Sequence, residues 1–227
     1  MRLSSYIMRI LHKGITMKKT LLSLSIILLT TGLIFASPSW IGIHGTGSYK
    51  QENTSFSVGA STIDEDHTAR LAGLAIAGTI YLQGAPVGIG FLLGSSKTTE
   101  ATRGSSSVDV SDFPLTWNAG VSGKFRSSMS EMLALEIGAG IQYELITQTS
   151  SIGGSDVDTA LSTFSLLTSA DVVVHLGDSL ALVGGIGASF PFSTRAKFVS
   201  GSVSYENEDI DRKGYAINGK VGLALGF

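Results

Sequence analysis

The sequence has no cysteine and only four prolines, and charged residues make up 15% of its 227 residues. Without cysteine, the chain cannot carry a disulfide framework, a thiolate metal site or a lipid-modified amino-terminal cysteine. The formal net charge is −2, and no basic stripe of the kind that nucleic acid requires is present. The composition therefore excludes a disulfide-stapled module and a nucleic-acid partner.

Long hydrophobic runs are also scarce, and the clearest one lies near the amino terminus. Met17-Lys18-Lys19-Thr20 precedes an apolar stretch from Leu21 to Phe35, which is followed by the small residue Ala36. Two lysines, an apolar core and a small residue are the parts of a secretory signal peptide. We predict a cleaved signal peptide over residues 1–36, with Met17 as the translation start. The alternative is a membrane-anchoring helix, although the run is shorter than the ~20 residues that a span needs.

Residues 37–227 contain no second long apolar helix, and the 28 glycines of the whole chain are spread through apolar segments. From Lys213 to Phe227, apolar and small or polar residues alternate, interrupted once at Gly219. Alternation at every second residue predicts an extended strand with one apolar and one narrow face. The apolar row consists of Tyr215, Ile217, Val221, Leu223, Leu225 and Phe227.

The same alternation predicts seven further strands, and the segments between them alternate between long and short. Such an order is typical of an all-β, eight-stranded antiparallel up-and-down transmembrane barrel with both termini at the short-turn end. The long polar segments should be mobile external loops, covering residues 51–68, 95–112, 147–158 and 193–212. The eight strands are expected near 39–50, 69–82, 87–94, 113–125, 133–145, 163–175, 180–192 and 213–227.

A soluble eight-stranded barrel would also alternate, but its outer face would carry large, well-solvated side chains. The polar face of these strands is mostly Gly, Ala, Ser and Thr, which suits the crowded interior of a membrane barrel instead. Aromatic residues at strand ends predict two girdles at the membrane interfaces. One girdle would contain Trp40, Tyr81, Phe125 and Phe227, and the other Tyr49, Phe113, Phe192 and Tyr215.

Two short stretches, Gly222 to Phe227 and Gly138 to Tyr143, resemble strands of small outer-membrane proteins of the OmpW, OmpX and OmpA-transmembrane type. Mature length and the second stretch lean toward the OmpW-like group. This resemblance implies an outer-membrane location with periplasmic termini, and a narrow, largely apolar internal path. It also implies that Phe227 is the signal by which the barrel-assembly machinery recognises the last strand.

Four ionisable residues carry the interior parity of their predicted strands, namely Lys124, Glu136, Asp171 and Lys220. Because unpaired charges within a membrane are costly, we expect them to meet across the lumen. They form either a structural salt-bridge plug or part of a gate or ion pathway.

Other candidate sites are weaker. The acidic segments 64–67 and 206–209 are either solvated loop tips or divalent-cation ligands, but they lack the spacing of a calcium loop. His44, His67 and His175 have no recognisable catalytic partner spacing. We therefore expect no enzymatic activity, no cofactor and no metal.

Two functions remain open from the sequence. One is porin-like passage of small apolar molecules, and the other is a non-conducting surface role in adhesion, host interaction or envelope integrity. The expected partners are outer-membrane lipid, the barrel-assembly machinery, and a small apolar solute or a host ligand.

Overall fold

A computed structural model describes residues 39–58, 61–82, 85–152, 155–201, 203–207 and 210–227. The predicted signal peptide, residues 1–36, lies outside this range. No helix in the described part of the chain is long and apolar enough to cross a membrane.

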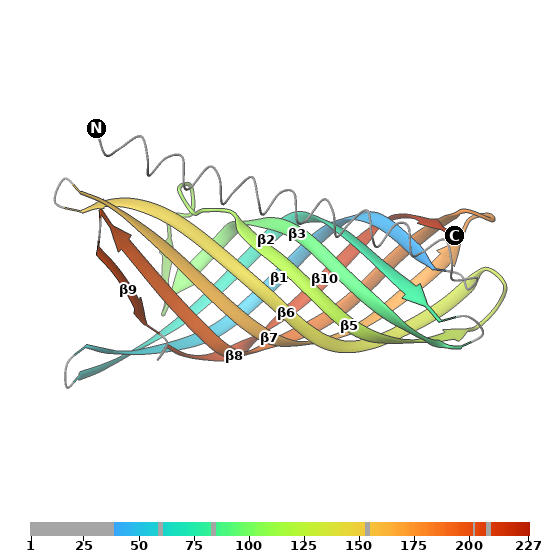
Figure 1. The fold of residues 1–227 in the computed structure, drawn as a ribbon, viewed down its shortest axis with the longest axis horizontal. Coiled ribbons are helices and arrows are strands. Elements are labelled where there is room, and N and C mark those ends of the chain that lie inside the picture. Colours follow the sequence, from blue (N-terminus) through green and yellow to red (C-terminus); the bar gives the residue numbers. More distant parts are fainter. Residues whose placement is uncertain (1–38, 59–60, 83–84, 153–154, 202, 208–209) are drawn as a thin grey trace.

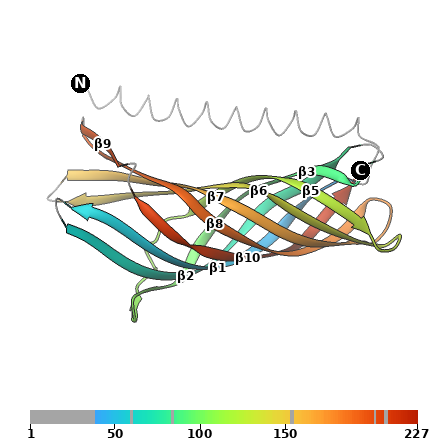
Figure 2. The ribbon, with the colours of Figure 1, turned by 90° about the horizontal axis from the view of Figure 1, so that it is seen from below.

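The described residues form one antiparallel sheet that closes on itself as a ring of eight long strands (Figures 1 and 2). Two short strands lie beside the ring: β4 (Ser106–Val108) pairs with β3, and β9 (Val203–Asn207) pairs with β8. The ring consists of β1 (Trp40–Val58), β2 (Ser61–Tyr81), β3 (Val87–Arg103), β5 (Thr116–Ser128), β6 (Leu133–Ile152), β7 (Ser155–His175), β8 (Leu180–Ser200) and β10 (Asp211–Gly226).

The carboxyl-terminal strand closes the ring. β10 pairs with β1 from Gly226 opposite Trp40 to Asp211 opposite Ser55. Its carboxyl-terminal part, from Ala216 to Leu225, also pairs with β8. Closure gives the main chain of both terminal strands a hydrogen-bonding neighbour, which an open edge in hydrocarbon would lack. The predicted eight-stranded antiparallel up-and-down barrel is confirmed.

Large apolar side chains point out of the barrel and small ones point in. Ile186 on β8 is 70% exposed, whereas Val183 on the same strand is fully buried. A soluble protein rarely leaves so many large apolar side chains on a continuous surface, so this belt is suited to lipid. Other members of the belt are Ile43, Leu74, Ile89, Val121, Ile141, Leu166, Leu182, Val221, Leu223 and Leu225.

Interior glycines let neighbouring strands approach closely. A Cβ atom on Gly140 would lie 2.0 Å from the carbonyl oxygen of Val121, and one on Gly222 would lie 2.0 Å from that of Ile43. No side chain fits at such distances from a neighbouring backbone, so the narrow curvature of the barrel requires glycine at these two positions.

The prediction of four long mobile loops was wrong for most of their length. β1 runs to Val58 and β2 begins at Ser61, so the first predicted loop is largely a strand pair. Polar side chains pair across this extension, with Ser55 Oγ 2.5 Å from Asp64 Oδ1 and Asn53 Nδ2 2.9 Å from Asp66 Oδ1. Apolar alternation stops where both faces meet water, but the main-chain ladder continues, so the pattern underestimates the strands.

The third, sixth and seventh predicted strands are also longer than their apolar pattern. β3 continues to Arg103, β7 begins at Ser155, and β8 continues to Ser200. The predicted strand at 113–125 begins later than expected, at Thr116, because Pro114 has no N–H group for the ladder.

Two predicted girdle residues face the lumen instead. Trp40 and Tyr81 are each only 1% exposed, so their assignment to a lipid-facing girdle was wrong. At the same end of the barrel, Phe125 and Phe227 remain exposed on the outside, while Tyr49 and Phe192 are exposed toward the other end. Aromatic residues at strand ends are expected in a girdle. Trp40 and Tyr81 have the parity of the inward-facing residues on their strands, so their side chains point into the lumen.

Candidate functional site

The interior of the barrel brings Lys124, Asp171 and Lys220 together near the short-turn end. Lys124 Nζ lies 2.5 Å from Asp171 Oδ2, and Lys220 Nζ lies 3.0 Å from Asp171 Oδ1. The Lys124 ammonium also donates to Ser169 Oγ at 2.7 Å. Asp171 is fully buried, so one carboxylate neutralises part of the charge of two lysines away from water.

Glu136 lies beside Asp171 in the register of β6 and β7 but has different partners. Its carboxylate accepts hydrogen bonds from Trp40 Nε1 at 2.9 Å and from Thr79 Oγ1 at 3.2 Å. Its nearest cationic group in an ion pair is Arg126, with Nη1 3.8 Å from Oε1. The four predicted lumen residues are therefore neighbours, but Glu136 is held chiefly by a tryptophan and an arginine.

Arg126 lies just beyond the predicted strand at 113–125 and so was not among the predicted lumen residues. β5 continues to Ser128, so Arg126 keeps the inward parity of Lys124 and is nearly buried. Its Nη2 lies 2.7 Å from His175 Nε2, and its guanidinium lies 5.6 Å from the centre of the Tyr81 ring. The signal was present, since residues two apart on a strand share a face.

We call Lys124, Arg126, Glu136, Asp171 and Lys220 the lower cluster. Around it, Trp40 and Tyr81 fill the remaining width of the lumen, and Lys220 Nζ lies 5.6 Å from the centre of the Trp40 ring. Small side chains that are completely or almost completely buried complete the packing below: Ala77, Ala134, Val173, Ala181, Val183 and Ala224. These side chains pack against one another at this level of the lumen.

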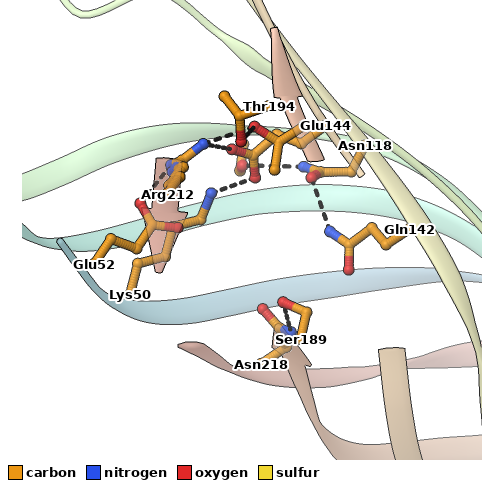
Figure 3. A network of polar contacts seen from close by, with 11 residues as sticks. Lys50, Glu52, Asn118, Gln142, Glu144, Ser189, Thr194, Arg212 and Asn218 are labelled. Atoms are coloured by element: carbon orange, nitrogen blue, oxygen red, sulfur yellow. Dashed lines mark hydrogen bonds and ion pairs between the residues drawn. The ribbon is translucent and has the colours of Figure 1, made fainter. Parts of the chain in front are cut away.

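A second polar network, the upper cluster, crosses the lumen farther from the short turns and consists of Lys50, Glu52, Glu144 and Arg212 (Figure 3). Lys50 forms an ion pair with Glu144, and Arg212 forms one with Glu52. Arg212 Nη1 also lies 3.8 Å from Glu144 Oε1. Two cations face two carboxylates, so the upper cluster is balanced. The upper cluster was not predicted, because Glu52 and Arg212 lie in segments that were expected to be loops.

A chamber of about 120 Å³ lies between the two clusters. Lys124, Asp171, Lys220 and Trp40 line its floor, and Lys50 and Glu144 line its roof. Three inward-facing leucines contribute to its wall, namely Leu71, Leu92 and Leu167. Leu71 has the same inward parity as Ala75 and Ala77 on β2 and is buried like them.

The barrel wall loses one strand pairing just above the chamber. β8 and β10 pair as far as Ser189 opposite Ala216. Beyond this pair, the described part of β10 is paired with β1 alone, and β8 next pairs with β9 from Ala196 onward. Ser189 belongs to the chamber lining, so the chamber lies directly below the point where the two strands separate.

The acidic and histidine candidates lie in different surroundings. His67 lies 3.4 Å from Glu65 within β2, and Glu65 also forms an ion pair with Arg103 of β3. His44 is buried on the lumen side, 5.6 Å from Trp40 between ring centres. Among the described residues, no group of three or more His, Asp or Glu is placed to hold a metal ion. Residues 208 and 209 of the second acidic segment lie outside the described residues.

A closed eight-stranded barrel with an apolar outer belt and a charged, narrow interior defines a class of membrane β-barrel. No protein-family model matches the sequence, and no curated protein matches it.

Solved structures do match the fold. The outer membrane protein OprG from Pseudomonas aeruginosa matches with 11% identity and a TM-score of 0.58, over 85% of this chain and 97% of that chain. A major outer membrane protein from Thermus thermophilus matches with 12% identity and a TM-score of 0.50, over 80% of this chain and 99% of that chain. The chain has the fold of small outer-membrane β-barrel proteins, as its sequence predicts.

Proposed function

We propose that this protein is a non-enzymatic barrel of the outer membrane that passes small apolar molecules through its interior. The chamber carries the proposal, because the inward-facing leucines Leu71, Leu92 and Leu167 give it an apolar wall between the two charged clusters. An apolar wall with a few polar groups is the usual composition of a small-molecule site. Above Ser189 and Ala216, β8 and β10 are no longer paired with each other. We propose that a small molecule enters the chamber between these two strands.

The lower cluster is the feature that distinguishes the proposed barrel from an open, ion-conducting porin. Glu136 and Asp171 are both fully buried among lumen side chains, which favours a barrel closed to water and ions at this level. A solute in the chamber would reach the other side only when side chains of the lower cluster move. We propose that the barrel takes up apolar solutes without carrying a steady ion current.

Chamber occupancy can be measured through Trp40, because the protein has two tryptophans and the other, Trp117, lies on the outer surface. In a Trp117→Phe background, a small bromoalkane should quench Trp40 in a saturable way. Gly120 is the position to block: a Cβ there meets Leu167 and Leu92 at 3.8 and 3.9 Å, so Gly120→Leu fills the chamber without a backbone clash.

The matched control is Gly123→Leu, because Gly123 lies on the outside of the same strand. We expect Gly120→Leu to abolish the quenching and Gly123→Leu to leave it unchanged. In vesicles with a lipopolysaccharide outer leaflet, bromoalkane uptake should exceed that of empty vesicles and should fall with Gly120→Leu alone. Unsaturable quenching together with uptake equal to that of empty vesicles would refute the proposal.

A surface role is the second candidate, favoured by strands that continue beyond the apolar belt. Phe198 and Tyr205 pair across β8 and β9 with ring centres 6.5 Å apart, and both are exposed beside Val203. Exposed apolar groups above a membrane are suited to contact with another surface. A barrel with this role alone would show no saturable quenching of Trp40.

We propose that the short turns face the periplasm and the long hairpins face outward, and that Phe227 directs assembly. Phe227 exchanges two main-chain hydrogen bonds with Ser39, at 3.0 and 3.1 Å, and its side chain is exposed at the rim. Deleting Phe227 should lower the amount of barrel in the outer membrane several-fold, because an unassembled chain is degraded. The purified chain should still refold in detergent.

Immunoblots of outer-membrane fractions would measure this effect. Phe125→Ala is the control, since Phe125 is also exposed at the short-turn end but precedes no chain terminus. Normal membrane levels of the truncated chain would remove the assembly role from Phe227.

A further inference from the structure

The floor of the chamber carries one more positive than negative group. Asp171 is shared between Lys124 and Lys220, one lysine on each carboxylate oxygen. Adding Arg126 and Glu136 gives three cations and two carboxylates in the lower cluster. The upper cluster, by contrast, is balanced. The excess charge therefore lies at one end of the chamber.

Lys220 is the more accessible of the two lysines on the chamber floor. Its side chain is 15% exposed, compared with 5% for Lys124, which also donates to Ser169. The Lys220 ammonium has three N–H donors, and its contacts are Asp171 on one side and the Trp40 ring on another. A ligand oxygen above the floor can accept a further hydrogen bond from this ammonium.

We propose that the chamber binds a small amphipathic monocarboxylic acid, with its carboxylate on Lys220 and its apolar tail against Leu92 and Leu167. This inference rests on the proposed function and names the solute class. A single negative charge brings the lower cluster to neutrality, which matters because unpaired charge is costly in a water-poor lumen. An ammonium compound would add to the excess, and a doubly charged anion would reverse it.

The chamber volume sets the length of the acid. At about 120 Å³ it is somewhat smaller than the roughly 150 Å³ cavity known to hold benzene. A chain of about five carbons, such as pentanoate, is therefore a suitable probe. Pentan-1-ol and pentylammonium have the same number of carbon atoms as pentanoate and carry a neutral and a positive head group instead of a negative one.

The test is competition with the bromoalkane for Trp40 in the full Trp117→Phe chain. We expect pentanoate to relieve quenching at a concentration about tenfold or more below that of pentan-1-ol, because a charge-assisted hydrogen bond is stronger than a neutral one. Pentylammonium should compete least well. Lys220→Met should make pentanoate and pentan-1-ol equal, whereas Lys97→Met, which alters an exposed lysine on β3, should keep the preference.

The outcomes separate this inference from the proposed function. Equal competition by pentanoate and pentan-1-ol would overturn the acid preference and leave the apolar chamber intact. Absence of saturable quenching in the first place would remove both. A preference for pentanoate that persists in folded Lys220→Met protein would also overturn the assignment. The comparison of the three probes in the unsubstituted lumen decides the question even where Lys220→Met does not fold.

Discussion

Replacing Asp171 with asparagine will lower the free energy of unfolding of the barrel by about 3–5 kcal/mol, the usual effect of removing one partner from a buried ion pair. Asparagine keeps the shape of the side chain. This matters because the Asp171 side chain packs closely against Gly185. The substitution leaves the ammonium groups of Lys124 and Lys220 without the carboxylate that they share. The urea midpoint of unfolding in lipid vesicles, followed by heat-modifiable gel mobility, measures the loss.

Two further variants make the result specific to charge. Asp178→Asn, in the exposed turn after β7, should leave the midpoint unchanged. Combining Asp171→Asn with Lys220→Met should recover part of the loss, because the lower cluster then has two cations and one carboxylate instead of three and one. An Asp171→Asn barrel as stable as the unsubstituted protein would mean that the two lysines find water or another counterion.

The ring of eight strands was predictable because hydrocarbon imposes a simple rule on each strand. Apolar side chains must face lipid and small ones must fill a narrow lumen, so Val183 and Ile186 can be assigned to opposite faces by counting. The final strand carries this pattern most completely. Its pairing with β1 then follows from the need to leave no edge in the membrane.

The strand extensions were not predictable by the same rule. Above the apolar belt both faces of β1 and β2 meet water, so Asn53 and Asp66 pair as polar neighbours where no apolar alternation remains. A polar segment of this kind resembles a loop in sequence, although its backbone stays in the ladder. The hydrophobic pattern therefore marks the membrane belt and not the ends of the strands.

The interior site was only partly accessible to sequence reasoning. Parity alone places Lys124, Glu136, Asp171 and Lys220 inside, but the choice of partner depends on how the strands are staggered around the ring. Glu136 lies opposite Asp171 on one side and opposite Arg126 on the other. Glu136 therefore has a like-charged neighbour on β7 and a cationic neighbour on β5. Both depend on the register between strands, which the sequence of one strand does not determine.

The chamber was beyond sequence reasoning for a different reason. Leu71 and Leu92 both keep the inward parity of their strands, β2 and β3, so each can be assigned to the lumen singly but not to a common patch. Leu71, Leu92 and Leu167 come from strands that are not all neighbours in the ring, so their meeting requires the closed barrel. An apolar patch formed across a lumen has no linear signature.

Replacing Trp40 with alanine will open the short-turn end of the barrel to ions. Trp40 is the largest completely or nearly completely buried side chain in the described structure, and it is also a hydrogen-bond donor to Glu136. Its removal leaves a void beside a buried carboxylate that has lost a partner, and such a polar void fills with water. Because Trp40 also lines the chamber floor, this water would connect the chamber with the short-turn end.

The measurement is single-channel current in planar bilayers, where the unsubstituted barrel should stay at the baseline. The upper cluster is a weaker barrier, since its four side chains keep 9% to 13% of their surface exposed, whereas those of Glu136 and Asp171 keep none. Loss of the indole should also reduce the free energy of unfolding by about 3–5 kcal/mol. Gel mobility before and after boiling would show which variants are folded.

Trp117→Ala is the matched control, because it removes the same side chain from the lipid-facing surface, where Trp117 is 51% exposed. It should produce no current. Glu136→Gln then separates packing from charge, since glutamine keeps most of the volume but removes the negative group. Current from Trp40→Ala alone would mean that the indole closes the lumen by filling it. Current from Glu136→Gln as well would mean that the charges of the lower cluster form a gate. A folded Trp40→Ala barrel without current would assign the closure to the ion pairs around Asp171.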